Sequence, residues 1–292
     1  MVPSFPNQEV KVKPGHESQT AIMVCAARAA AHGRTAVAAF TDPTALALLP
    51  ENARLRVERF RSGVPPTSLR ERLRFAFLDR RSKMMVARTV SIDVAIREAG
   101  FSQVVILGAG LDGRAWRMPA LADATVFEVD HPDSQREKRV RAASLKQAAH
   151  DVRFVPVDFT RDRLEDALAS AGHDSARPTT WVWEGVVMYL ERADIEVTLR
   201  VVEARSAPRS RLVVLYHSPS IIRKMAGVYL RRIGEPVRSA FTGNEMRALL
   251  AGFGFAVVED DDLATIATRI SAELAGAERF VKALRIVTAE SR

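Results

Sequence analysis

The sequence predicts an α/β protein with a doubly wound, mostly parallel sheet of seven strands and an N-terminal helical cover. The first observation is an apolar, mostly β-branched run at 104–107 that leads directly into Gly108-Ala109-Gly110. A buried parallel strand has this pattern, and glycines after it let the backbone approach a ligand closely. The second observation is that strand and helix patterns alternate from residue 101 onward, which is typical of a parallel sheet with helical crossovers.

The composition is that of an ordinary globular protein. The chain has 292 residues, of which 47% are hydrophobic and 27% charged, enough to bury one large α/β core. Cys25 is its only cysteine, which excludes an internal disulfide and a cysteine-based zinc site, and no other metal site is expected. No apolar stretch approaches the roughly 18 residues of a membrane span. Residues 1–15 lack the apolar core of a signal peptide, so a cytoplasmic location is expected.

The first hundred residues predict helices and no strand. An alanine-rich helix is expected over 17–32, and a short helix over 42–50 with an Asp-Pro start. Residues 51–66 are charged and end in Val-Pro-Pro, which favours a surface connection. A long arginine-rich helix with at most one break is expected over 68–99, and Gly100 ends it.

Beyond the glycine loop the chain predicts six further strands with helices between most of them. The expected strands are 125–130, 152–157, 180–183, 211–216, 255–259 and 283–288, and the expected helices are 114–122, 132–149, 162–171, 192–206 and 242–252. The last strand can return antiparallel between its neighbours. We therefore expect a helical cover over 1–100 and an α/β domain over 101–292, with a basic helical lid inserted at about 219–240.

Acidic residues stand at the ends of three successive predicted strands. Glu128 and Asp130 end the second strand, Asp158 follows the third, and Glu184 follows the fourth. Ligands of a doubly wound sheet bind beyond the carboxyl ends of its strands, where a carboxylate after the second strand can accept from both ribose hydroxyls. Asp158 is placed to accept from an adenine amine, with the backbone N–H of Phe159 beside it, and Glu184 can meet an ammonium group. Since Glu128 and Asp130 point to the same side of a strand, which of them meets the ribose stays open.

Four segments at these strand ends resemble the leucine carboxyl methyltransferase family, and more closely its bacterial S-adenosyl-L-methionine-dependent branch. They are Gly-Ala-Gly-Leu-Asp at 108–112, Phe-Glu-Val-Asp-His-Pro at 127–132, Val-Asp-Phe at 157–159 and Trp-Glu-Gly-Val-Val-Met-Tyr-Leu at 183–190. The resemblance extends from about residue 20 to residue 216. It implies a class I methyltransferase fold, which is Rossmann-like, and S-adenosyl-L-methionine as cofactor.

The resemblance also implies a role for each cofactor-binding residue. Gly108 would meet the methionine part of the cofactor, with Gly110 in the same loop, and Asp130 would bind the ribose. Asp158 and Phe159 would bind the adenine. The cofactor carboxylate would pair with Arg88 and its amino group with Glu184, and Arg28 aligns loosely as an assisting residue.

The glycine loop also allows other interpretations. Gly108, Gly110 and Gly113 spell the G-x-G-x-x-G pattern of dinucleotide-binding folds. The resembled family has threonine or serine where this chain has Gly113, and Asp112 and Pro119 predict that the helix after the loop is short and irregular. An NAD(P)-dependent oxidoreductase and a non-catalytic nucleotide-binding subunit remain as alternatives.

We expect O-methylation of a carboxylate or hydroxyl on a small molecule or peptide, and the resemblance does not identify the acceptor itself. A carboxylate is ionised at pH 7 and needs no general base, whereas a hydroxyl acceptor needs one. Tyr189 and His217, which lie just past strand ends, are the candidate residues at the acceptor. The formal net charge is +8, and residues 51–90 hold eleven arginines and lysines against four acids, which modestly favours an anionic acceptor. No nucleic-acid partner is expected, and the oligomeric state is left open.

Overall fold

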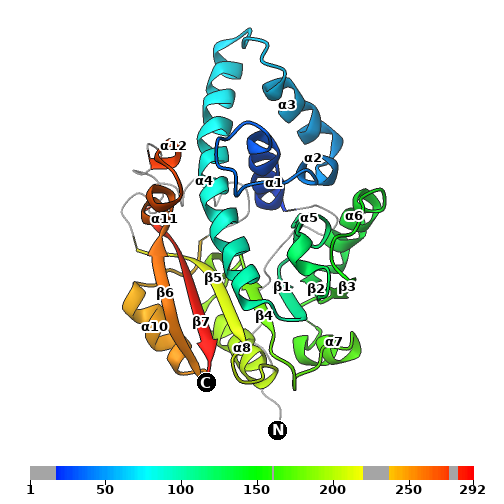
Figure 1. Cartoon of the computed structure of the whole chain (residues 1–292), viewed down its shortest axis with the longest axis vertical. Coiled ribbons are helices and arrows are strands. Elements are labelled where there is room, and N and C mark those ends of the chain that lie inside the picture. Colours follow the sequence, from blue (N-terminus) through cyan, green and yellow to red (C-terminus); the bar gives the residue numbers. More distant parts are fainter. Residues whose placement is uncertain (1–17, 160, 220–236, 276–281) are drawn as a thin grey trace.

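A seven-stranded sheet forms the centre of the protein (Figure 1). The computed structural model describes residues 18–159, 161–219, 237–275 and 282–292. The strand order is β3-β2-β1-β4-β5-β7-β6. The strands are β1 (Gln103–Leu107), β2 (Thr125–Asp130), β3 (Asp151–Pro156), β4 (Thr180–Trp183), β5 (Arg211–His217), β6 (Phe255–Asp262) and β7 (Leu284–Ser291). β1 to β5 pair in parallel, and β7 runs antiparallel to both of its neighbours, so the predicted α/β fold is confirmed.

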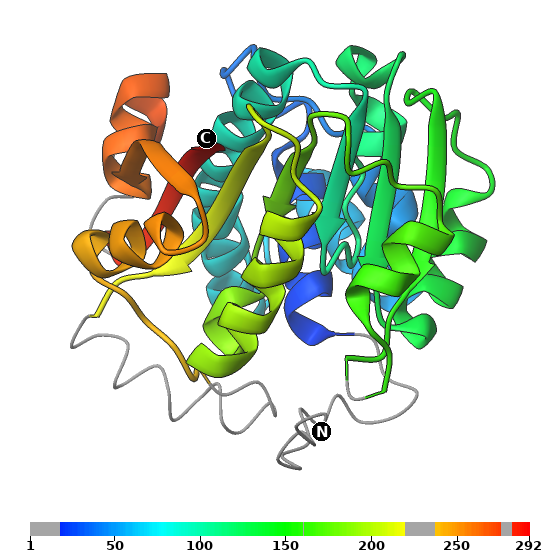
Figure 2. The same cartoon turned by 90° about the horizontal axis from the view of Figure 1, so that it is seen from below.

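Helices pack on both faces of this sheet, in three layers (Figure 2). The helices are α1 (Gln19–Ala31), α2 (Ala45–Leu48), α3 (Glu51–Arg61), α4 (Leu69–Ala99), α5 (Arg114–Arg117), α6 (Pro132–Ala142), α7 (Leu164–Ser170), α8 (Arg192–Ala204), α10 (Gly243–Ala251), α11 (Leu263–Ile270) and α12 (Ala272–Ala275), with single 3-10 turns η1 (Pro119–Leu121) and η2 (Val187–Tyr189). Alternate strand residues face opposite sides. Val104 and Ile106 pack with α1 to α4 and α11, whereas Val105 and Leu107 pack with α7, α8 and α10.

α1 to α3 and the first half of α4 lie beyond the carboxyl ends of the parallel strands, and the second half of α4 packs on one face of the sheet (Figure 1). α4 is continuous over 31 residues, so the break allowed by the sequence is absent. The Ser68 side chain accepts from the backbone N–H of Glu71 at its start, and Gly100 ends it in the left-handed conformation with φ of 61°. Within the described residues, no helix is both long and apolar enough to cross a bilayer.

Three predictions of local structure were wrong. Residues 51–61 form helix α3 rather than a surface connection, because Ala53, Val57 and Phe60 recur at helical spacing and are buried. α6 ends at Ala142 instead of continuing to about residue 149. Beyond its end, the N–H groups of residues 148 and 149 donate to the carbonyl of Ala115 and not to a preceding helical turn. α11 was not predicted.

An N-cap marks the start of that missed helix. The Asp262 carboxylate accepts from the backbone N–H groups of Ala264 and Thr265. The predicted lid at about 219–240 lies largely outside the described residues, as does most of its basic cluster (Arg223, Lys224, Arg231 and Arg232).

Candidate functional site

The loop after β1 carries two glycines in the left-handed region, where other residues are strained. Gly108 has φ of +70° and Gly110 has φ of +46°. The N–H groups of Gly108 and Ala109 both donate to the carbonyl of Val129 at 2.8 and 3.0 Å, which ties the loop to the end of β2. A Cβ atom on Gly108 would lie 2.3 Å from Cγ2 of Val186, so glycine is needed for the loop after β4 to approach this closely.

Gly113 has a different reason for being glycine. Its φ is −109°, which any residue adopts, but a Cβ atom there would lie 2.2 Å from the Thr44 hydroxyl oxygen. The Thr44 hydroxyl donates to Asp42, whose carboxylate also caps the turn that begins α2. The third glycine of the apparent dinucleotide pattern therefore makes room for the helical cover. The helix that follows, α5, is only four residues long.

The structure separates the two acids of β2. The Asp130 carboxylate accepts from the backbone N–H of Gly110 at 2.5 Å and from that of His131 at 2.6 Å, so it lies directly against the glycine loop. Glu128 is fully buried beneath it, and its carboxylate pairs with the Lys138 ammonium group of α6 at 2.7 Å. Burial raises the pKa of Glu128 to about 7, even though Lys138 opposes this shift. Asp130 therefore lies beside the glycine loop at the end of the strand, whereas Glu128 is enclosed by the protein.

Glu184, after β4, is held between two arginines. Its Oε1 accepts from Nε of Arg88 on α4 at 2.5 Å, and its Oε2 accepts from Nη1 of Arg114 on α5 at 2.7 Å. Burial alone would raise the pKa of Glu184, but Arg114 and Arg88 together hold it well below its usual range. This carboxylate is therefore ionised at any physiological pH.

Arg114 is itself fixed by two other carboxylates. Its Nε donates to Asp93 of α4 at 2.7 Å, its backbone N–H donates to Asp112 at 2.7 Å, and its guanidinium also pairs with Asp112. Asp93 is shared with Arg117, which donates to it at 2.6 and 3.0 Å. Sequence analysis did not single out Arg114, Asp93 or Arg117. Arg114 lies 21 positions from Asp93 and 70 positions from Glu184 along the chain. Only a charged Asp-x-Arg after the glycine loop indicated this cluster.

Arg28 closes this network from the first helix. Its Nε donates to the Asp42 carboxylate at 2.8 Å, and its Nη2 donates to the carbonyl of Leu111 at 2.5 Å. Arg28 thereby ties α1 and the turn before α2 to the glycine loop. Arg28, which aligned loosely with the family, is thus a neighbour of the site.

The remaining predicted residues lie at the same edge of the sheet, the one formed by the carboxyl ends of its parallel strands. The backbone N–H of Asp158 donates to Asp162 at 2.8 Å, and Phe159 beside it is 54% exposed. Tyr189 is in η2, and its hydroxyl donates to Thr20 of α1 at 3.2 Å. His217 is the last residue of β5, and its carbonyl accepts from the N–H of Phe241. Loops after β1, β2 and β4 are brought into contact at this edge, with Tyr189 linking η2 to the start of α1.

Tyr216 lies inside the sheet and does not line this edge. Its side chain is fully buried, and its hydroxyl contacts both Asp260 oxygens at 2.9 Å and Arg285 Nε at 3.0 Å. These contacts support a structural role for Tyr216. The complete burial of Trp181 supports a structural role for that residue too.

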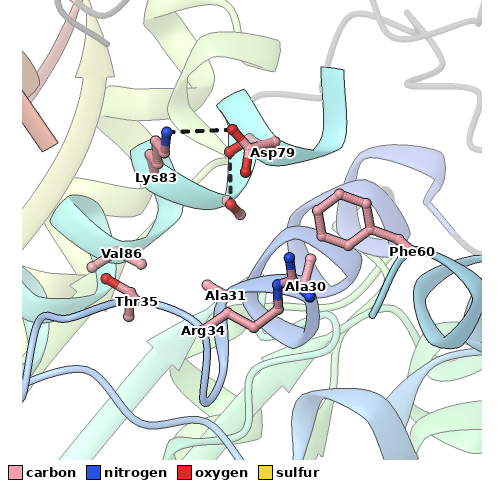
Figure 3. Close-up of a pocket in the computed structure, with 9 residues that line it drawn as sticks. Ala30, Ala31, Arg34, Thr35, Phe60, Asp79, Lys83 and Val86 are labelled. Atoms are coloured by element: carbon pink, nitrogen blue, oxygen red, sulfur yellow. Dashed lines mark hydrogen bonds and ion pairs between the residues drawn. The ribbon is translucent and has the colours of Figure 1, made fainter. Parts of the chain in front are cut away.

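Two hollows in the described residues lie away from this edge. One pocket of about 80 Å³ lies among α1, α3 and α4 and is lined by Arg34, Asp79 and Lys83 together with apolar residues (Figure 3). Another, of about 280 Å³, lies between α4, α11 and the β6–β7 edge. Neither pocket is lined by a residue that the sequence predicts for cofactor or acceptor binding. Both are therefore separate from the predicted site.

Comparison with known proteins identifies the family. The model of the leucine carboxyl methyltransferase family matches residues 21–203. The chain belongs to this family. The match covers α1 to α4, the glycine loop and the strand ends up to α8, which is where the site described above lies.

Curated relatives of the chain come from bacteria. It is 36% identical over 160 residues to a "putative S-adenosyl-L-methionine-dependent methyltransferase" of Streptomyces coelicolor, covering 54% of each chain. It is 38% identical over 170 residues to a protein of the same description from Mycobacterium tuberculosis, covering 57% of this chain and 53% of that one. The chain thus spans about half the length of the curated relatives it matches.

Solved structures share the fold at low sequence identity. A DUF574 family protein from Streptomyces avermitilis has a TM-score of 0.59 at 13% identity, covering 97% of this chain and 100% of that one. A "putative methyltransferase" from Thermobifida fusca has a TM-score of 0.52 at 15% identity, covering 85% and 92%. The architecture is therefore the class I methyltransferase fold.

Proposed function

We propose that this protein is an S-adenosyl-L-methionine-dependent methyltransferase that methylates oxygen, in a carboxylate or hydroxyl of a small molecule or peptide. The observation that carries this proposal is the Asp130 carboxylate held against the Gly108–Gly110 loop by backbone N–H groups. A carboxylate oxygen has a second lone pair, so Asp130 can still accept from ribose hydroxyls. The family membership and the names of the relatives support the same activity.

The described residues fit such a cofactor. Gly108 and Gly110 leave a backbone surface that a Cβ atom would fill, as close approach of a ligand requires. Arg88 and Glu184 present one positive and one negative group side by side, which matches the carboxylate and ammonium of an amino acid. Asp158 and Phe159 lie at the end of β3 and would take the adenine. When bound, the cofactor supplies an electrophilic methyl group on a positively charged sulfur.

The contribution of the protein to this reaction is chiefly positioning. In a displacement at a methyl group, the acceptor oxygen must lie in line with the bond that breaks. A carboxylate acceptor needs no proton removed at pH 7, whereas for a hydroxyl acceptor we assign the base role to His217, with Tyr189 as a further residue at the acceptor. The arginines and Lys83 in the first half of α4 favour an anionic acceptor by steering it electrostatically.

The proposal is tested first by cofactor binding. We expect Asp130→Ala to weaken binding of S-adenosylhomocysteine at least about tenfold in a calorimetric titration, because two ribose hydrogen bonds to a charged acceptor are lost. Asp133→Ala is the matched control, since this carboxylate lies three residues away and pairs with Arg136 at the surface. Equal affinities of Asp130→Ala and the unchanged protein would refute the assignment.

The alternatives are separated by two further measurements. Saturable binding of NADH without binding of S-adenosylhomocysteine would favour the oxidoreductase. Binding of S-adenosylhomocysteine without methyl transfer to any cell extract would favour a non-catalytic subunit. With a radiolabelled methyl donor, label released by mild alkali indicates an ester and hence a carboxylate acceptor, whereas stable label indicates an ether.

A further inference from the structure

The two residues proposed to hold the amino-acid part of the cofactor are bonded to each other in this structure. Arg88 Nε lies 2.5 Å from Glu184 Oε1, and both side chains are about nine-tenths buried. The proposed roles require Arg88 to meet a carboxylate and Glu184 to meet an ammonium group. A ligand that enters between the two side chains opens this ion pair.

An amino-acid zwitterion carries the same two charges that this ion pair contains. If it enters between the two side chains, Arg88 exchanges one carboxylate for another and Glu184 exchanges one cation for another. The buried network stays electrically balanced, as it is now, with Arg28, Arg88, Arg114 and Arg117 against Asp42, Asp93, Asp112 and Glu184. A ligand with only one of the two charges would leave its counterpart buried without compensation, which is strongly unfavourable.

The contacts indicate which partner of the ion pair stays in place. Arg114 is 3% exposed and is bonded to Asp93, Asp112 and Glu184 at once. It therefore holds the second oxygen of Glu184 at 2.7 Å whether or not Arg88 remains on the first. The guanidinium of Arg88 lies against Gly185, where a Cβ atom would come within 3.0 Å of its Nη2. Arg88 thus lies beside a position without a side chain, whereas Arg114 is enclosed by charged partners.

We propose that Arg114 is a positioning residue that keeps Glu184 in place while the Arg88–Glu184 ion pair exchanges for the amino-acid zwitterion of the cofactor. This inference rests on the proposed function, because it takes the assigned ligand as given. The buried network of arginines and carboxylates then distinguishes ligands with the amino-acid part from those without it, since a nucleoside without that part leaves the Arg88–Glu184 ion pair closed.

Two ligands that differ in this part alone test the proposal by calorimetric titration. S-adenosylhomocysteine carries the zwitterion, and 5′-methylthioadenosine carries the same nucleoside and a thioether without it. For Arg114→Gln we expect affinity for S-adenosylhomocysteine to fall at least about tenfold, as when one partner of a buried charge pair is truncated. We expect its affinity for 5′-methylthioadenosine to stay within about twofold of the unchanged protein, which also shows that the variant is folded.

Arg117→Gln is the matched control, because it removes a buried arginine from the same helix and the same Asp93 without touching Glu184. Any loss of affinity in Arg117→Gln should be the same for both ligands. Arg114→Lys should bind S-adenosylhomocysteine more tightly than Arg114→Gln does. Should Arg114→Gln not fold, Asp93→Asn loosens Arg114 with little change of shape and should show the same selective loss. Equal losses for both ligands in Arg114→Gln, or in Asp93→Asn where that variant replaces it, would overturn the positioning role. If the unchanged protein binds neither S-adenosylhomocysteine nor 5′-methylthioadenosine, the proposed function is overturned instead.

Discussion

Replacing Gly108 with alanine tests the close approach that builds the site. The substitution has two costs in the free energy of unfolding. An alanine at φ of +70° is disfavoured by about 1–2 kcal/mol, because its Cβ crowds the following carbonyl oxygen. The new Cβ would also lie 2.3 Å from Cγ2 of Val186, far inside the normal contact distance, and such overpacking costs about 1–3 kcal/mol. Together we expect a loss of roughly 2–5 kcal/mol.

Gly33→Ala separates the two costs. Gly33 has nearly the same φ, +71°, but no atom lies within 4 Å of a Cβ built there. It should therefore show the backbone cost alone, and the difference between the two variants should be about 1–3 kcal/mol. Equilibrium unfolding in urea measures both values under identical conditions.

A second substitution checks the assigned contact. Val186→Ala removes Cγ2, so in the double variant Gly108→Ala/Val186→Ala the losses should be smaller than the sum of the single losses by at least about 1 kcal/mol. Equal destabilisation by Gly108→Ala and Gly33→Ala, or additive losses in the double variant, would refute the argument that Val186 requires glycine at position 108.

Two further predictions concern the free energy of unfolding and do not involve ligand binding. Burial raises the pKa of Glu128 from 4.5 to about 7, so between these values the folded protein keeps a proton that the unfolded chain releases, and stability falls as the pH rises. Urea unfolding should show this fall, at most about 1.4 kcal/mol per pH unit, disappearing in Glu128→Gln, and an unchanged pH slope in that variant would contradict the assignment. Thr242 forms a capping box with Glu245 at the start of α10, so Thr242→Ala should lower the free energy of unfolding by about 1 kcal/mol while Thr242→Ser retains it. A loss equally large in Thr242→Ser would show that the cap is not the cause.

Much of the fold could be predicted from local patterns. Apolar runs marked the seven strands, and residues such as Ser68, Gly100 and Thr242 marked helix ends, because caps depend on side chains within a few positions. α3 was missed because its charged residues hid three buried positions, Ala53, Val57 and Phe60. α6 was extended too far because residues 148 and 149, beyond its end at Ala142, bond to the distant Ala115 carbonyl, a contact that no local pattern indicates.

The choice between the two acids of β2 required the tertiary structure. Strand alternation places Glu128 and Asp130 on the same side, and both are acidic, so their surroundings along the chain do not distinguish them. Lys138 of α6 pairs with Glu128 inside the protein, whereas the glycine loop leaves Asp130 at the strand end. The distinction depends on how α6 packs on the sheet.

By itself the sequence determined the parallel sheet, the glycine loop and the row of strand-end acids, because strand periodicity and strand ends are local properties. Only the tertiary structure decided which partners those acids have. It joins Arg88 and Asp93 of the helical cover to Arg114 and Glu184 of the α/β part, across as many as 96 positions. Buried charges are stable only with partners at a few ångströms, and chain folding alone sets which partners those are.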